Sequence, residues 1–257
     1  MQLDNILGID VGGSGLKGAI VNMTTGQLMT ERFRIPTPKP ATPEAVAATF
    51  KEIIAHFNWT GPVGCGVPAV VRNGITLTAA NIDPAFINTD VQKMFSEISN
   101  CDVTILNDAD AAGIAELYFG AVGNQEGTVI MLTLGTGIGS ALFTDGILIQ
   151  NTEFGHLKFE KTIAEKYCSD GVRKKEDLNW KEYGIRLNKY LQHIELLFSP
   201  DLILLGGGAS KHFSKFESAI ELNFTKVKPA QLLNEAGIIG AAYYSFLKQN
   251  QSETKNV

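Results

Sequence analysis

The stretch from Val103 to Ala112 constrains the fold most strongly, because an apolar run ends there abruptly in polar side chains. The β-branched residues before Asn107 are typical of a buried strand, and the Ala-rich residues after Asp110 recur at helical spacing. The strand therefore delivers a carboxylate, Asp108, to the start of a helix. Asn107 or Asp108 could equally be no more than the N-cap residue of that helix, since both residue types are common caps.

Two glycine-rich turns favour a catalytic role for Asp108. Each follows a predicted strand, and they are Asp10-Val11-Gly12-Gly13-Ser14 and Leu134-Gly135-Thr136-Gly137-Ile138-Gly139. Glycines let backbone amides approach an anion, so both turns are candidate phosphate cradles. A carboxylate base between two such turns indicates phosphoryl transfer. The phosphate-binding candidates are Gly12, Gly13, Ser14, Lys17, Gly135, Thr136, Gly137 and Gly207, although Gly207 could belong only to a tight turn between a strand and a helix.

Two commoner phosphate-binding motifs are excluded at the first turn. The segment Gly13–Gly18 has the G-x-G-x-x-G spacing of a dinucleotide site, but that site needs a helix directly after it. Here the segment Leu16–Val21 reads as a second strand. The P-loop pattern also fails, because Lys17 is followed by Gly18 and not by Ser or Thr.

Composition excludes several classes of protein. The chain has 257 residues, enough for two modest domains, and a net charge of −5 argues against a nucleic-acid partner. The sequence has no apolar run near the roughly 20 residues of a membrane span and begins without the features of a secretory signal, so we expect a cytoplasmic protein. Cys65, Cys101 and Cys168 are odd in number and far apart, which predicts neither a disulfide framework nor a C-x-x-C metal site.

Coarse secondary structure predicts a pattern that occurs twice. A strand, a glycine turn and a second strand occur at Ile6–Val21 and again at Thr128–Phe143. This weak internal duplication predicts two lobes with a cleft between them. Further predicted elements are a third strand at Gln27–Ile35, helices at Glu44–Phe57, Trp180–Phe198 and Ala236–Leu247, a strand at Asp201–Leu205 and a polar tail at Gln249–Val257 that should fray.

Taken together, the motifs resemble the sugar kinases of the repressor/open-reading-frame/kinase (ROK) family, within the actin-like ATPase superfamily. Besides the glycine turns and Asn107-Asp108-x-Asp110, the matching pieces are Glu153-x-Gly155-His156 and Gly206-Gly207-Gly208. They occur in family order over nearly the whole chain. The family's usual Cys-rich zinc loop is missing. The segments Ala80-Asn81-Ile82-Asp83 and Glu195–Leu202 resemble the branch without that loop, the polyphosphate glucokinases.

This resemblance implies both a fold and a reaction. The implied fold class is α/β, a two-lobed actin-like ATPase (ribonuclease H-like) fold, with an N-terminal lobe at 1–107 completed by a helix at 236–248 and a C-terminal lobe at 108–235. The implied reaction phosphorylates glucose at the 6-hydroxyl, with inorganic polyphosphate or ATP as donor, Mg²⁺ and no zinc. Asp108 would be the general base, Asp10 would lie near the metal, and a homodimer is expected. The implied sugar-binding residues are Asn81, Asn107, Asp108, Glu153 and His156.

Several alternatives stay open. A strictly ATP-dependent glucokinase or another hexose kinase would carry the same motifs. The family also contains sugar-binding transcription regulators, but these are expected to carry a helix-turn-helix before the first glycine turn, whereas this chain begins five residues before its first strand. His156 alone would more often be a buried core histidine. Arg173, Lys174 and Lys175 form a basic cluster that could bind a polyanion or be only part of a solvated helix.

Overall fold

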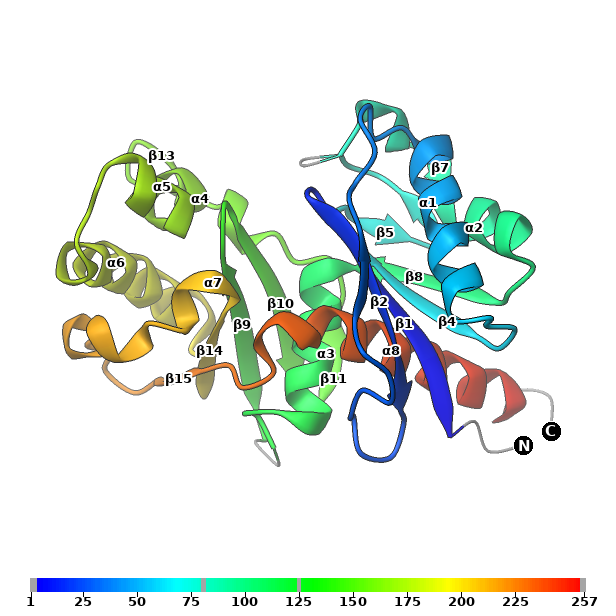
Figure 1. The fold of residues 1–257 in the computed structure, drawn as a ribbon. Helices are drawn as coiled ribbons and strands as arrows, with labels where there is room; N and C mark the ends of the chain where they lie inside the picture. The colour runs from blue at the N-terminus through cyan, green and yellow to red at the C-terminus, as the bar shows by residue number, and fades with distance from the viewer. Residues whose placement is uncertain (1–3, 80–81, 124–125, 255–257) are drawn as a thin grey trace. The chain divides into compact units, whose positions relative to one another are not determined.

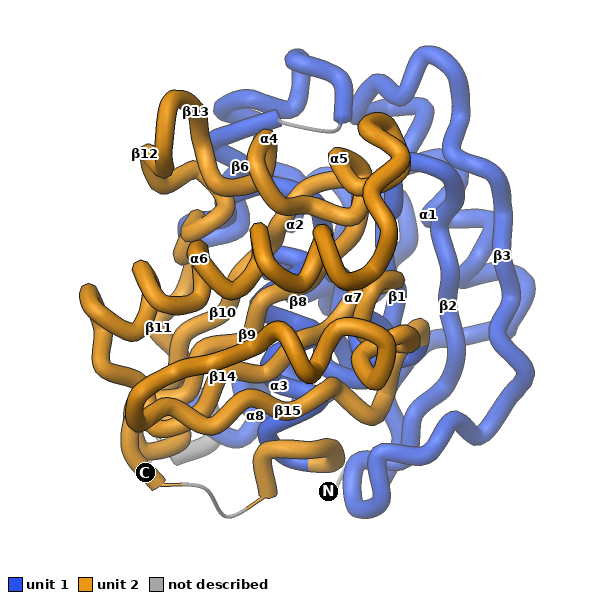
Figure 2. The backbone as a smooth tube through the Cα atoms, turned by 90° about the vertical axis from the view of Figure 1, so that its left-hand side faces the viewer, with its two compact units in different colours: residues 1–118, 235–257 blue, residues 119–234 orange. Residues whose placement is uncertain are grey.

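The computed structural model describes residues 4–79, 82–123 and 126–254, the last three by their backbone alone, so Asn81 lies outside the described residues. The chain forms two compact units, coloured separately in Figure 2. Unit 1 comprises residues 1–118 and 235–257, and unit 2 comprises residues 119–234. The predicted lobe boundary falls at the start of α3 (Asp108–Phe119), whereas the units divide at its end. The helix stays with unit 1 because its backbone at Ala111 packs closely on Gly240.

Unit 1 is built on a five-stranded sheet in the order β3-β2-β1-β4-β8 (Figure 1). β1 pairs antiparallel with β2, and β2 with β3, whereas β4 runs parallel to both β1 and β8. Strands buried on both faces read as near-continuous apolar runs, which explains the composition of β4 and β8. The strands are β1 (Asn5–Gly12), β2 (Gly15–Asn22), β3 (Phe33–Ile35), β4 (Val63–Val67) and β8 (Val103–Asn107).

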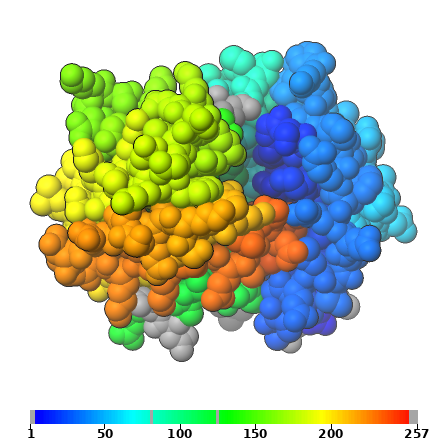
Figure 3. Space-filling view, turned by 60° about the vertical axis from the view of Figure 1, so that its left-hand side comes forward, coloured from blue at the N-terminus to red at the C-terminus, as the bar shows by residue number. Residues whose placement is uncertain are grey.

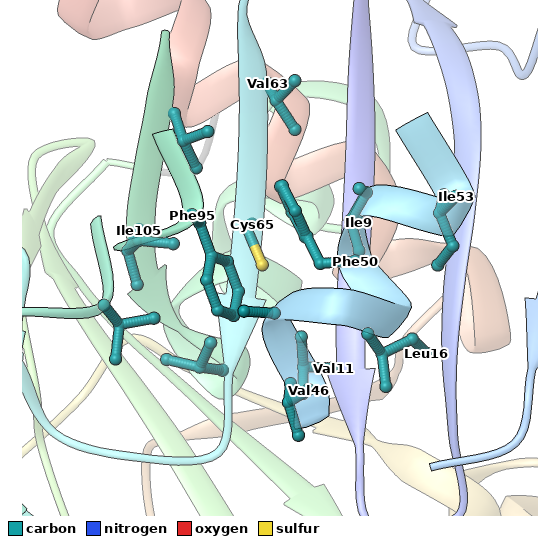
Figure 4. Packing of buried hydrophobic residues seen from close by; sticks show 14 of the residues in the cluster. Ile9, Val11, Leu16, Val46, Phe50, Ile53, Val63, Cys65, Phe95 and Ile105 are labelled. Carbon is teal, nitrogen blue, oxygen red and sulfur yellow. The ribbon is translucent and has the colours of Figure 1, made fainter. Parts of the chain in front are cut away.

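Helices cover both faces of this sheet. On one face lie α1 (Pro43–His56) and α2 (Val91–Ser99), whose aromatic residues Phe50 and Phe95 belong to the same buried cluster as Ile9 (Figure 4). On the other face α8 (Ala236–Thr254) packs against β1 and β4. Gly8 and Gly64 face α8, and a Cβ on either would collide with its backbone. The absence of a side chain at these two positions is what permits the close packing.

Three parts of unit 1 differ from the predicted elements. The third strand is only Phe33–Ile35, because Ile20 N donates to the hydroxyl of Thr30, which takes the place of a strand carbonyl. The predicted polar tail is helical as far as Thr254, and Gln249 Nε2 donates to Asp102 Oδ2 at 2.5 Å. A further three-stranded sheet was not predicted as such and contains β5 (Val71–Arg72), β6 (Ile75–Thr76) and β7 (Thr89–Asp90), with a 3-10 turn, η1 (Pro84–Phe86), before β7.

Unit 2 repeats the plan of the first sheet, in the order β11-β10-β9-β14-β15. In both sheets three antiparallel strands are followed by two parallel ones. The predicted duplication is therefore present in the topology. The strands are β9 (Thr128–Leu134), β10 (Ile138–Thr144), β11 (Ile147–Ile149), β14 (Leu202–Gly206) and β15 (Lys226–Pro229).

The core of unit 2 is organised by α6 (Trp180–Phe198), which has the bounds that its apolar spacing predicts. Its buried face, at Tyr183, Leu187, Tyr190, Leu191 and Ile194, packs with residues of β9 and β14. The remaining elements are short and comprise η2 (Phe154–His156), β12 (Lys158–Phe159), β13 (Thr162–Ile163), α4 (Ala164–Cys168), α5 (Asp170–Lys175), α7 (Gly207–Ser210), η3 (Phe213–Lys215), η4 (Glu217–Ala219) and η5 (Leu233–Glu235). In the described part of the chain, no helix combines the length and the apolar character that crossing a bilayer requires.

Candidate active site

The first glycine turn joins β1 to β2 and belongs to the N-terminal hairpin, deep blue in Figure 3. Gly13 and Ser14 form its exposed tip. Asp10 and Lys17 are paired across the two strands, and Lys17 Nζ lies 3.2 Å from Asp10 Oδ2. Gly237, in the first turn of α8, faces the same carboxylate, since a Cβ there would lie 3.2 Å from Asp10 Cγ. The amino end of a helix is a favourable place for a negative charge.

Asn107 caps α3, one of the two interpretations that the sequence left open. Its Oδ1 accepts hydrogen bonds from Ala109 N at 2.9 Å and from Asp110 N at 3.1 Å, and its Nδ2 donates to Ala69 O at 3.1 Å. The side chain is buried, with 6% of the residue exposed. An amide nitrogen carries two hydrogens, so one N–H remains for a substrate. Sugar binding by Asn107 stays a prediction.

Asp108 is the first residue of α3 and is partly exposed. Its Oδ1 accepts a hydrogen bond from Ala109 N at 2.8 Å. The cap formed by Asn107 fixes the backbone at this point, so the carboxylate is attached to a rigid element at the end of β8. This placement suits a general base, which must be held in a fixed position while its carboxylate stays accessible.

Glu153 and His156 lie together in unit 2. His156 Nδ1 is 3.0 Å from Glu153 Oε2 across the short turn η2. The side chain of His156 is 47% exposed and that of Glu153 is 37% exposed. The interpretation of His156 as a buried core histidine is therefore wrong. A carboxylate and an imidazole at the surface offer the acceptors and donors that sugar hydroxyls need.

Glu165, at the start of α4, joins this pair although the sequence did not single it out. Its Oε1 lies 4.0 Å from His156 Nε2, and its Oε2 accepts a hydrogen bond from Ile138 N at 3.4 Å. The second glycine turn passes directly beside it, since a Cβ on Gly137 would lie 2.5 Å from Glu165 Oε2. In the sequence Glu165 is hidden among alternating charges, and only its place at a helix start could have drawn attention to it.

The second glycine turn connects β9 to β10 and is closed by its own backbone. Gly135 N donates to Gly137 O at 3.0 Å, and Gly135 O accepts from Gly171 N at 2.9 Å. A Cβ on Gly171 would collide with Thr136, so α5 is docked directly on the turn. Gly207 has φ +77° and lies against the backbone of Leu134. This is the geometry of a tight turn between a strand and a helix, one of the interpretations given above. Phosphate binding at Gly207 stays a prediction.

Two of the three cations of the basic cluster on α5 contact one buried carboxylate. Asp170 is buried, and it accepts from Arg173 Nε at 2.6 Å and pairs with Lys174 Nζ at 2.7 Å. Burial alone would raise the pKa of Asp170, but the hydrogen bonds and charges of Lys174 and Arg173 outweigh burial and lower it. Arg173 also lies over the Trp180 ring, 4.1 Å from its centroid. One carboxylate balances only one of the three positive charges, and the Lys174 side chain is 68% exposed, so polyanion binding by this cluster stays a prediction.

Both the sequence and the fold of this chain match known proteins. The sequence profile of the ROK family matches residues 6–175. The chain belongs to the ROK family. The predicted fold class is confirmed, because a ROK structure, the inorganic polyphosphate/ATP-glucomannokinase from Arthrobacter sp. strain KM, superposes with a TM-score of 0.91. That protein is 42% identical, and the match covers 96% of this chain and 100% of the other.

Further ROK relatives match over most of the length of this chain. The polyphosphate glucokinase of Mycobacterium tuberculosis is 47% identical over 93% of this chain and 90% of its own length. The polyphosphate glucokinase of Mycobacterium leprae is 44% identical over 93% of this chain and 74% of its own length. A ROK family glucokinase from Streptomyces griseus, whose structure was solved with glucose and AMPPNP, shares the fold with a TM-score of 0.78 at 22% identity.

Proposed function

We propose that this ROK protein phosphorylates glucose at the 6-hydroxyl, with inorganic polyphosphate as the donor and ATP as a second donor. The observation that carries the proposal is its 47% identity, over 93% of the chain, to a polyphosphate glucokinase. The name of the Arthrobacter relative, which includes both polyphosphate and ATP, supports the two donors. Formation of glucose 6-phosphate from glucose and polyphosphate, without any nucleotide, tests it.

In this proposal Asp108 accepts the proton of the 6-hydroxyl as that oxygen attacks the donor phosphorus. A sugar hydroxyl is a weak nucleophile, and a positioned base typically contributes about 10²–10⁴ to the rate. The support is the position of Asp108 in the first turn of α3, directly after Asn107, which is buried and caps this helix. The rest of the catalysis comes from positioning and from charge neutralisation around the phosphates.

Glu153 and His156 bind the sugar hydroxyls, and Glu165 joins them. The 3.0 Å contact between His156 Nδ1 and Glu153 Oε2 orients the imidazole, so that Nε2 is directed toward other partners. A polar site of this kind rejects sugars whose hydroxyls leave one of its groups unpaired. Asn81 and Asn107 complete the proposed sugar-binding set.

The backbone amides of the two glycine turns bind donor phosphates, and Asp10 would hold the Mg²⁺ that accompanies them. Asp10 fits this role, because Mg²⁺ at phosphates usually takes one or two carboxylates and keeps its waters. Lys17 pairs with the same carboxylate at 3.2 Å. Within the described residues, no cluster of three or more His, Cys, Asp or Glu could hold a metal by itself. When bound, Mg²⁺ neutralises charge on the phosphates.

The protein acts as a homodimer in this proposal, as its family resemblance suggests. Light scattering at micromolar concentration measures the mass directly. A species of twice the chain mass is expected, and a purely monomeric protein would contradict this part of the proposal.

A further inference from the structure

Three residues form one row across the sheet beside the first glycine turn. Asp10 on β1 is paired with Lys17 on β2, and Lys17 is paired with Arg34 on β3. Side chains that are directly paired across neighbouring strands project from the same face of a sheet. A carboxylate and two cations therefore share the face that carries the proposed metal and phosphate site. Arg34 stands 20 residues after Ser14, so the sequence did not connect it with this turn.

Arg34 is held against the turn itself. Its Nη2 donates to Ser14 O at 2.5 Å. Gly15 leaves room for the guanidinium, since a Cβ there would lie 2.6 Å from Arg34 Nε. The side chain is exposed nevertheless. A guanidinium carries five N–H donors, so a single bond to Ser14 O leaves most of them for a ligand.

The two cations of this row differ in whether a carboxylate balances their charge. Lys17 is balanced by Asp10, to which it is paired at 3.2 Å. Among the residues that the structure describes, Arg34 makes no ion pair with Asp or Glu. Arg34 is thus an uncompensated cation beside the turn to which the proposed function assigns donor phosphates. A planar guanidinium is also the side chain best suited to a bidentate contact with a phosphate.

We propose that Arg34 binds a phosphate of the phosphoryl donor at the first glycine turn and is a donor-binding residue of this enzyme. The inference rests on the proposed function, because it assigns donor phosphates to this turn. The alternative is a purely structural role, in which Arg34 only braces the Ser14 carbonyl. Thr37 shows what such a brace looks like, since its hydroxyl donates to Gly12 O at 2.5 Å.

Four variants separate the two roles. Arg34→Gln removes the charge but keeps a polar N–H donor on a shorter side chain, and Arg34→Lys keeps the charge but removes the planar, bidentate guanidinium. Thr37→Val removes the neighbouring brace. Lys51→Ala removes one exposed charge from α1 in the same unit. The probe is inorganic tripolyphosphate, whose binding is measured by calorimetric titration, and the KM for glucose is measured alongside.

Arg34→Gln should weaken tripolyphosphate binding by about tenfold or more, as expected for a hydrogen bond to a charged group, and leave the KM for glucose within about twofold. Arg34→Lys should fall between Arg34→Gln and wild type. Thr37→Val and Lys51→Ala should change binding by less than about threefold. Equal binding by Arg34→Gln and wild type, an equal loss in Thr37→Val, or no tripolyphosphate binding by wild type would each overturn the inference. Intact tripolyphosphate binding without any transfer to glucose would contradict the proposed function alone.

Discussion

Glu165 Oε1 lies 4.0 Å from His156 Nε2, while Glu165 Oε2 accepts a hydrogen bond from Ile138 N at 3.4 Å. One carboxylate therefore links the imidazole of the proposed sugar site to the first residue of β10, directly after the second glycine turn. The link means that the side chains proposed to bind the sugar and this turn share a support within unit 2. Because Glu165 is partly exposed, replacing it should disturb the position of His156 more than it lowers the stability of the fold.

Replacing Glu165 by Gln should raise the KM for glucose by about tenfold with little change in thermal stability. The amide oxygen can still accept from Ile138 N, whereas the carboxylate that is proposed to accept from a sugar hydroxyl loses its charge, and a hydrogen bond to a charged group is typically worth about 1.5–3 kcal/mol. Steady-state kinetics with glucose as the varied substrate measure the effect. Glu217→Gln, at an exposed position of the same unit, is the matched control. A normal KM for glucose would remove Glu165 from the sugar site.

Replacing Asp108 by Asn should lower kcat by about 10²–10⁴ while glucose binding stays within a few-fold of wild type. Asn keeps the size of the side chain and can still accept from Ala109 N, so α3 should remain intact. Turnover is measured by a coupled assay, and glucose binding is measured separately by calorimetry. Near-normal turnover in this variant would show that Asp108 is not the base.

Replacing Asn107 by Ala should lower the free energy of unfolding by about 1–3 kcal/mol, because the helix cap is lost and the buried Ala69 carbonyl loses its partner. Thr42→Ala is the control. Thr42 caps α1 by accepting from Ala45 N, so its loss should cost only the ordinary cap energy of about 1 kcal/mol. Urea denaturation compares the two. Equal losses would mean that the bond to Ala69 contributes nothing measurable.

Glu195 predicts an acid-sensitive part of the stability of unit 2. Burial alone would raise its pKa, but hydrogen bonds from the backbone N–H groups of Asn223, Phe224 and Thr225 and from the Asn223 side chain lower it to about 2. Because the folded-state pKa lies below the unfolded value of 4.5, the stabilisation is full above that pH and is lost as the pH falls toward 2.

Glu195→Gln should therefore cost roughly 2–3 kcal/mol at neutral pH, and this deficit should shrink below about pH 4. Unfolding by urea at a series of pH values measures it, with Glu217→Gln as the control. A deficit that does not change with pH would mean that the charge of Glu195 plays no part.

The residues that the sequence placed well are those whose role is set by local pattern. The strand before Asn107, the two glycine turns and the period of α6 all depend on neighbours within a few positions. Glu165 and Arg34 were not identified as site residues from the sequence, because each contacts its partner only after the sheet has assembled. The sequence left both interpretations of Arg173 open, and it did not show that Arg173 pairs with a buried Asp170 and lies over Trp180. Local sequence shows that a charge is present but does not show whether a partner has already neutralised it.

The most direct test is a glucose phosphorylation assay in which nucleotide-free polyphosphate is the sole donor. Glucose 6-phosphate is detected through its dehydrogenase, with ATP alone as the parallel reaction and Asp108→Asn as the blank. Polyphosphate should sustain turnover by the wild-type protein, and the Asp108→Asn protein should be slower by orders of magnitude. Efficient turnover with ATP and none with polyphosphate would contradict the donor assignment and leave an ATP-dependent glucokinase.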